Sequence, residues 1–319
     1  MAASASAQQV DEIASAALAE LPGKTAFLFA ELSDSGPKPL FALRADERFA
    51  VGSSFKLFIL GELIEEANEG RRRAADVMLL RADRIGPPAS ELAGWPTGSP
   101  ITLHTLALKM ISISDNTATD HLLYLLGREQ VEARMAAMGH GAAQLNRPLL
   151  STREMTMLRD KREGMPGRAY QKLNEQERRQ FLQSRLAAVP DYDKLDFDTA
   201  SYDLAEWYAS PMDMAHALNW IYLHTKPGQP AALIRDILAV DPKLPHDRAT
   251  WPFVGFKGGS EDQLLAGNWL LKNRNGNWYS FHVFCNSPRA TIEPEQLMKA
   301  TMAIFAAIEK LLGDGGRKN

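Results

Sequence analysis

The sequence predicts an α+β fold, in which an antiparallel sheet of about five strands is interrupted by an inserted all-helical lobe. Two observations carry this prediction: β-rich segments occur only near the two ends of the chain, and the long middle segment has helical periodicity. Strands at both ends most simply join one sheet, with the terminal helices over one face. We expect a sheet lobe of residues 1–50 and 213–319 and a helical lobe of residues 51–212, containing a loop insertion at about 148–206.

The elements of the first fifty residues follow from periodicity and turn residues. Val10–Leu21 has apolar residues at helical spacing, and Pro22-Gly23 ends it. Thr25–Leu32 is a compact apolar run typical of a strand. The turn residues of 34–37 separate it from a second strand, Pro39–Leu43, so the two strands form a predicted hairpin.

The middle of the chain is predicted to be helical and the end returns to strands. The predicted helices are Phe55–Glu66, Leu103–Ile111, Asn116–Leu126, Arg128–Met138, Glu175–Ala188, Pro211–His224 and Pro230–Val240. The predicted strands are Phe253–Lys257, Leu264–Lys272 and Trp278–Cys285, the last two flanking an Asn-Gly turn. Pro294–Leu312 closes the chain as an amphipathic helix.

Composition excludes several classes of protein. The chain has 319 residues, 45% of them hydrophobic, and 36 Lys and Arg residues nearly balance 39 Asp and Glu residues. This balance is not that of a nucleic-acid-binding protein. The apolar runs are too short to span a bilayer. The single Cys285 excludes an intrachain disulfide, and the scattered histidines predict no metal site. We expect a small-molecule or peptide substrate and leave the oligomeric state open.

The first seven residues bear on localisation. Met1–Ala7 resembles the small-residue end of a secretory signal, but no basic or apolar region precedes it. One interpretation is a periplasmic or secreted protein whose signal peptide is absent from this sequence. The alternative is a frayed polar terminus of a cytoplasmic protein.

The first of three chemical motifs opens the predicted helix after the hairpin. It reads Ser53-Ser54-Phe55-Lys56, a Ser-x-x-Lys pattern, and residues three apart share one helical face. A lysine whose pKa is lowered by burial can act as the base for such a hydroxyl. The helix N-terminus adds a partial positive charge beside the attacking oxygen.

Two further motifs follow in the chain. Ser114-Asp115-Asn116 stands at the junction of two helical segments, where its serine could relay a proton and its asparagine could hold a substrate amide. Lys257-Gly258-Gly259-Ser260 ends a predicted strand. Its glycines let the backbone approach a ligand, and its lysine suits a substrate carboxylate. Each motif alone is more often a cap, a turn or a loop, but their order and contexts agree.

With these motifs the sequence resembles the penicillin-recognising serine enzymes, and is most similar to the class A β-lactamase-like group. The resemblance covers nearly the whole chain. Further matching stretches are Ile101-Thr102 with Leu106, Asn116-Thr117-Ala118, Ser210-Pro211-Met212 and Met214-Ala215. The resemblance implies an antiparallel sheet flanked by helices plus an all-helical lobe, with the nucleophilic serine at their interface. It implies no cofactor.

The resemblance also implies a role for each motif residue. Ser53 corresponds to the acylated nucleophile, Lys56 to its base and Ser114 to the proton shuttle. Among the substrate-binding residues, Asn116 corresponds to a side-chain amide that holds the substrate, and Lys257 to the anchor of its carboxylate.

The third motif contributes backbone as well. The backbone N–H groups of Ser53 and Ser260 would form the oxyanion hole, with Gly259 beside them. One departure stands here, because Gly258 replaces the hydroxyl residue that the family usually has. The missing hydroxyl is expected to weaken the affinity for β-lactams.

A larger departure concerns the carboxylate that activates the deacylating water. The hydrolytic members have a glutamate just after the stretch that Leu145-Asn146-Arg147 matches, but here Pro148-Leu149-Leu150 follows. We expect Arg147 to pair with Glu206 and close the neck of the insertion; two solvated charges are the alternative. Possible replacement bases are Glu154, Asp203 and Glu206, which the sequence does not rank.

The sequence therefore predicts a serine hydrolase that forms an acyl-enzyme on Ser53. A β-lactam is the first candidate substrate. The alternatives are a peptidase or esterase acting on another substrate, and a penicillin-binding protein that deacylates slowly.

Overall fold

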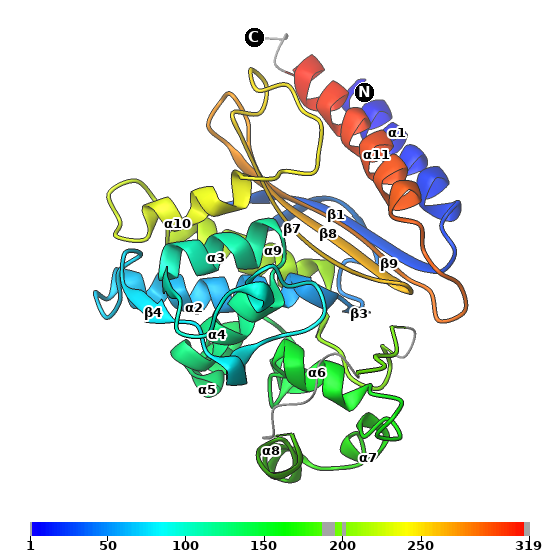
Figure 1. Cartoon of the computed structure of the whole chain (residues 1–319). Helices are drawn as coiled ribbons and strands as arrows, with labels where there is room; N and C mark the ends of the chain where they lie inside the picture. Colours follow the sequence, from blue (N-terminus) through cyan, green and yellow to red (C-terminus); the bar gives the residue numbers. More distant parts are fainter. Residues whose placement is uncertain (1, 187–194, 200–201, 316–319) are drawn as a thin grey trace.

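The computed structural model describes residues 2–186, 195–199 and 202–315, and its centre is one antiparallel sheet (Figure 1). The five strands stand in the order β2-β1-β9-β8-β7, so strands from the two ends of the chain lie side by side. Their bounds are β1 (Lys24–Leu32), β2 (Lys38–Leu43), β7 (Phe253–Glu261), β8 (Leu264–Lys272) and β9 (Trp278–Asn286). The predicted fold class is confirmed, and β8 begins and ends where the sequence predicts.

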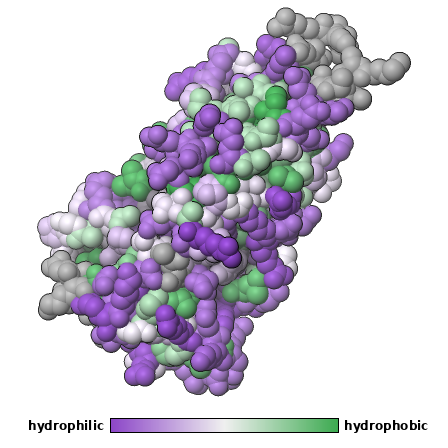
Figure 2. All heavy atoms as spheres, turned by 90° about the vertical axis from the view of Figure 1, so that its right-hand side faces the viewer, coloured by the Kyte–Doolittle hydropathy of each residue, from purple (hydrophilic) through white to green (hydrophobic). Residues whose placement is uncertain are grey.

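Two terminal helices cover one face of the sheet. They are α1 (Ala2–Ala19) and α11 (Pro294–Gly315), which lie next to each other in Figure 1. Their apolar side chains, among them Leu18 and Ile304, pack with Phe29 and Phe281 of the sheet. Figure 2 views this side of the molecule, where hydrophilic residues predominate and hydrophobic areas are small and scattered. The amphipathic pattern of the terminal helices therefore has its apolar side turned toward the sheet.

The opposite face of the sheet packs against the helical layer. Its helices are α2 (Lys56–Asn68), α3 (Leu103–Ser112), α4 (Asn116–Leu126), α5 (Arg128–Ala137), α9 (Pro211–Leu223) and α10 (Ala232–Asp236). The central helix, α2, is buried on nearly all sides because helices and sheet surround it. The segment predicted as one helix at Pro230–Val240 is instead α10 followed by a 3-10 turn, Ile237–Ala239.

The insertion at 148–206 has more regular structure than the sequence predicts. It contains α6 (Thr152–Leu158), α7 (Gly167–Tyr170) and α8 (Glu175–Arg185), of which α7 and α8 lie far from the sheet in Figure 1. Only α8 was expected from the sequence, and residues 187 and 188 of its predicted end lie outside the described residues. Charged residues interrupt the apolar pattern of α6, and α7 is a four-residue helix that begins at a glycine, so neither gives a helical pattern long enough to predict.

Two short strand pairs connect the insertion and loops to the main body. Strand β3 (Phe49–Ala50) pairs with β6 (Tyr208–Ala209), and β4 (Val77–Leu79) pairs with β5 (Pro100–Thr102). The β3–β6 pair holds the end of the insertion beside the start of α2. None of the helices in the described part of the chain combines the length and apolarity needed to cross a membrane.

Candidate active site

The candidate nucleophile lies in a tight turn just before the buried helix α2. Ser53 is part of η1 (Gly52–Phe55), a 3-10 turn that leads directly into α2. Gly52 has a φ of +49°, a conformation that glycine adopts without strain. The turn lies so close to β7 that a Cβ atom on Gly259 would be 2.7 Å from the Ser53 nitrogen. Glycine at 259 therefore allows the strand to approach the candidate nucleophile.

Two adjacent serines of this turn have opposite environments. Ser53 lines a cleft of about 830 Å³, whose walls include β7, the loop between α3 and α4, and α6. Ser54 is fully buried, and its hydroxyl accepts a hydrogen bond of 2.9 Å from Asn268 Nδ2 on β8. Ser53 is therefore the serine that a substrate in the cleft can reach.

Lys56, the first residue of α2, connects the first motif to the second. Its Nζ donates to the Ser114 carbonyl at 2.6 Å, to the Ser114 hydroxyl at 3.1 Å and to Asn116 Oδ1 at 2.7 Å. The side chain is fully buried. Its hydrogen bonds thus go to the second motif and not to Ser53.

Ser114 occupies a strained backbone position between two helices. Its φ is +60°, in the left-handed region, where a residue other than glycine costs about 1–3 kcal/mol. In this conformation its carbonyl and its hydroxyl both face Lys56. From the other side, Lys257 Nζ donates to the same hydroxyl at 3.0 Å. The loop thus places one hydroxyl between two lysines.

The two lysines have lowered pKa values. Burial lowers the pKa of Lys56 to about 7, against the opposing effect of the negative charges of Asp120 and Asp115. Burial also lowers the pKa of Lys257 well below its usual value, and the positive charge of Lys56 lowers it further. Because both amines surround an uncharged hydroxyl, a neutral amine is accessible near neutral pH. Such a group can act as a general base.

The cleft brings the three motifs together. The motif residues along its wall are Ser53, Ser114, Asn116, Lys257, Gly258, Gly259 and Ser260. A Cβ atom on Gly52 would be 3.3 Å from the Ser260 nitrogen, so the backbone of η1 and the end of β7 lie next to each other. A pair of backbone N–H groups at such a junction is the usual form of an oxyanion hole.

The unusual glycine of the third motif has a local steric reason. A Cβ atom on Gly258 would be 2.6 Å from the Cζ atom of Phe256, two residues earlier on the same strand. The Phe256 ring packs on Trp269, with 4.9 Å between the ring centroids. The ring thus occupies space that a threonine or serine at 258 would need.

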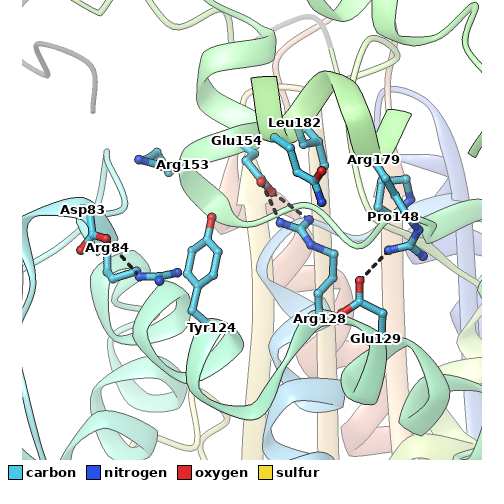
Figure 3. Close-up of a pocket in the computed structure, with 11 residues that line it drawn as sticks. Asp83, Arg84, Tyr124, Arg128, Glu129, Pro148, Arg153, Glu154, Arg179 and Leu182 are labelled. Atoms are coloured by element: carbon cyan, nitrogen blue, oxygen red, sulfur yellow. Dashed lines mark hydrogen bonds and ion pairs between the residues drawn. The ribbon is translucent and has the colours of Figure 1, made fainter. Parts of the chain in front are cut away.

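Glu154, the first candidate base, points away from the cleft. Figure 3 shows it facing Arg128, and the two side chains make bidentate hydrogen bonds of 2.9 and 2.7 Å. The carboxylate also accepts from the backbone N–H of Ser151 at the start of α6. The pocket around this pair, about 460 Å³, is a different one from the cleft. Glu154 therefore holds the start of α6, and its proposed role as base is wrong for this geometry.

Neither Glu206 nor Asp203 lines the cleft. Glu206 is fully buried against Arg159, whose Nη2 donates to it at 2.9 Å. Burial, together with the charge of Glu261, raises the pKa of Glu206. Asp203 is exposed at another pocket. The predicted pairing of Glu206 with Arg147 is also wrong, because Arg159 from the end of α6 reaches the carboxylate instead.

Two polar residues near the site were not predicted from the sequence. Asp120 on α4 and Thr152 at the start of α6 are hydrogen-bonded to each other behind Asn116. The spacing of Asp120, four residues after Asn116 on one helix, was a usable signal. No sequence signal pointed to Thr152, because only the fold brings the insertion next to Asn116 and Asp120.

Comparison with known proteins identifies the family. The model of the β-lactamase enzyme family Beta-lactamase2 matches residues 6–298, so the chain belongs to this family. Family membership makes it a hydrolase of the β-lactamase-like class. No sequence among the curated proteins matches it.

Solved structures of low sequence identity share the fold over nearly the full length. A β-lactamase from Sphaerobacter thermophilus DSM 20745 is 20% identical with a TM-score of 0.66, covering 95% of this chain and 97% of its own. A β-lactamase from Chitinophaga pinensis DSM 2588 is 17% identical with a TM-score of 0.63, covering 98% and 99%. PBP-A is 18% identical with a TM-score of 0.61, covering 96% of each chain.

Proposed function

We propose that this protein is a serine hydrolase that forms an acyl-enzyme on Ser53 and hydrolyses it with water. One observation carries the proposal. Two buried lysines, Lys56 and Lys257, share the Ser114 hydroxyl beside a cleft that Ser53 lines. Buried amines with lowered pKa values around an uncharged hydroxyl are suited to proton transfer rather than to an ion pair.

Acylation follows from this arrangement. Ser53 Oγ attacks the substrate carbonyl, and its proton passes to the neutral amine of Lys56. The backbone N–H groups of Ser53 and Ser260 stabilise the oxyanion; losing one such donor typically costs about 10²–10³-fold in rate. Ser114 gives its proton to the leaving nitrogen or oxygen, and the lysines replace that proton through their hydrogen bonds to its hydroxyl.

A β-lactam is the first candidate substrate. Solved structures with this fold are described as β-lactamases, and one is an acyl-enzyme complex of a PBP-A variant with penicillin G. The Lys257 ammonium suits the carboxylate that such compounds carry. A peptide or small ester is the alternative substrate, because Gly258 supplies no hydroxyl for that carboxylate.

The second candidate function is a penicillin-binding protein that acylates and deacylates slowly. The favouring observation is that none of Glu154, Asp203 and Glu206 lines the cleft. Pre-steady-state kinetics separates the two candidates. A burst of product equal to the enzyme concentration, followed by little turnover, supports the slowly deacylating penicillin-binding protein.

Mass spectrometry of the intact protein after mixing with a penicillin tests acylation directly. The expected result is a mass increase of one penicillin, located on the peptide that contains Ser53. Ser53→Ala should abolish the adduct, whereas the matched variant Ser54→Ala should still be labelled. Labelling of Ser53→Ala, or its loss only in Ser54→Ala, contradicts the assignment of the nucleophile.

A further inference from the structure

Asp120 is a buried carboxylate whose hydrogen-bond donors all come from the start of α6. It lies on α4 with no solvent exposure. Its Oδ1 accepts from the Thr152 nitrogen at 2.8 Å and from the Thr152 hydroxyl at 2.9 Å, and its Oδ2 accepts from the Arg153 nitrogen at 3.0 Å. The two backbone N–H groups hold the carboxylate in place, and the hydroxyl is its only side-chain donor among the described residues.

Thr152 connects this carboxylate to the cleft. It is a lining residue of the cleft, together with Asn116. Its Oγ1 lies 3.3 Å from the Asn116 carbonyl oxygen, and the Asn116 side chain accepts from Lys56. The Thr152 hydroxyl therefore lies between the catalytic side of the cleft and Asp120. A hydroxyl both accepts and donates, so it can pass a proton from a water in the cleft to the carboxylate behind it.

Other carboxylates in the neighbourhood are less suited to this task. Asp115 is also buried near Lys56, but it does not line the cleft and accepts from Ser90, Leu92 and Ala118. Glu261 lines the cleft but pairs with the guanidinium of Arg159 at 2.5 Å. Asp120 has no arginine or lysine within ion-pair distance among the described residues. No such cation therefore lowers the proton affinity of its carboxylate.

We propose that Asp120, acting through the Thr152 hydroxyl, is the base for the water that hydrolyses the acyl-enzyme. The inference rests on the proposed function. The water oxygen bonds to the acyl carbon, its proton goes to Thr152 Oγ1, and the hydroxyl proton of Thr152 goes to Asp120 Oδ1. The ester bond to Ser53 then breaks, and Ser53 Oγ takes up the proton that Asp120 releases. Lys56 is then still the neutral amine that the next acylation requires.

The charges around Asp120 define the expected pH dependence. Burial raises its pKa to about 6, against the opposing effect of the hydrogen bonds from Thr152 and Arg153. The charged and titratable neighbours are Lys56 from α2, Glu154 from α6, Asp115 at the N-cap of α4 and Tyr124 on α4 itself. The carboxylate form is the base, so deacylation should rise with pH through about 6. The pKa of Lys56 lies in the same pH range. The rise of the deacylation rate with pH is therefore assigned to Asp120 only if it is lost in Asp120→Asn.

The experiment separates acylation from deacylation in single-turnover mixing, with a penicillin and an activated p-nitrophenyl ester as probes. Deacylation is followed by the loss of the adduct in mass spectra. Thr152→Val keeps the shape and the backbone donor of Thr152 but removes the hydroxyl. We expect it and Asp120→Asn to slow deacylation about 10²-fold or more, the usual contribution of a general base, while acylation changes by less than tenfold.

Two further variants distinguish a relay from a structural role. Thr152→Ser restores the hydroxyl and should keep deacylation within tenfold of the parent. Thr156→Val removes a buried hydroxyl one turn later on α6, where it bonds to the carbonyls of Thr152 and Pro87, and should leave deacylation unchanged. Thermal melts of all four variants report their folding. If Asp120→Asn fails to fold, Thr152→Val and Thr152→Ser decide the question.

Three results would overturn the relay. They are fast deacylation by folded Thr152→Val, an acid limb that persists in Asp120→Asn, and a parent acyl-enzyme that does not hydrolyse at all. Failure of the proposed function is recognised separately, because then neither probe acylates Ser53 in the parent protein and the relay has no substrate.

Discussion

Buried cations occur in two regions of this molecule with opposite partners. In the cleft, Lys56 and Lys257 both donate to the uncharged hydroxyl of Ser114. At the insertion, Arg128 of α5 and Arg159, which follows α6, each face a glutamate of the insertion within 3 Å. Lys56, Lys257 and Arg159 are buried and Arg128 is mostly covered, but only the arginines have a carboxylate to neutralise their charge directly.

The difference separates chemistry from architecture. Without a direct carboxylate partner, burial lowers the pKa of Lys56 to about 7, so the amine can gain and lose a proton near neutral pH. An arginine paired with a glutamate remains charged and holds two chain segments together. The acids expected to activate water, Glu154 and Glu206, belong to this second class.

The largest expected effect comes from removing the central amine of the cleft. Lys56→Met takes away the proposed base for the Ser53 proton, so the acylation rate should fall about 10²–10⁴-fold. Stopped-flow mixing with a β-lactam or an activated ester measures it. Lys109→Met, which removes a lysine paired with Glu91 outside the cleft, is the control and should acylate normally. Normal acylation by folded Lys56→Met would remove the lysine from the mechanism.

The next largest expected effect is a loss of stability when a buried arginine is removed. Arg159→Met leaves Glu206 and Glu261 buried without their cation, and breaking a buried pair costs about 3–5 kcal/mol. Urea denaturation gives the free energy of unfolding. Arg147→Met is the matched control: among the described residues Arg147 makes no salt bridge, so we expect a loss below about 1 kcal/mol. A larger loss for Arg147→Met would restore the pairing predicted from the sequence.

A smaller effect on stability is expected from the ion pair between Glu154 and Arg128. Glu154→Gln weakens the charged contact with Arg128 but keeps an oxygen for the helix cap, so the free energy of unfolding should fall by about 1.5–3 kcal/mol. Turnover of bound substrate should stay within a few-fold, because this side chain lies outside the cleft. A selective loss of deacylation in a stable Glu154→Gln would return Glu154 to the site.

The smallest expected effect is the pH dependence of the acylation rate, which needs no substitution. In the proposed mechanism the neutral amine of Lys56 takes the Ser53 proton, so the acylation rate should fall about tenfold for each pH unit below about 7 and level off above it. His282 does not account for this limb, because burial lowers its pKa to about 3. Single-turnover acylation rates between pH 5.5 and 8.5 give the profile. A flat profile would show that Lys56 does not change its protonation state in this step.

Much of the fold and the core of the candidate site were predictable from residues close together in the chain. Helix α4 has the predicted bounds, because its apolar spacing and its Asp115 cap are local signals. The three motifs are short, so each places its reactive residues without knowledge of the fold. Their meeting in one cleft required that the fold bring both β7 and the loop between α3 and α4 next to the start of α2.

The partners of the insertion could not be predicted in the same way. The sequence suggested Arg147 for Glu206, whereas the structure pairs Glu206 with Arg159, which an intervening helix, α6, carries into reach. Asp120 and Thr152 are 32 residues apart and meet through the packing of α4 against α6. Charge and hydrophobicity patterns do not encode such pairs, because any arginine can satisfy any glutamate until packing selects one.

The sequence by itself determined which groups can do chemistry: a serine at a helix start, two lysines, a second serine and a glycine-lined strand end. Only the tertiary structure decided which carboxylates can act with them. Burial places Glu154 and Glu206 against arginines and leaves Asp120 with hydrogen-bond donors alone. The physical reason is that reactivity depends on desolvation and on the nearest charge, and both are properties of the packed protein.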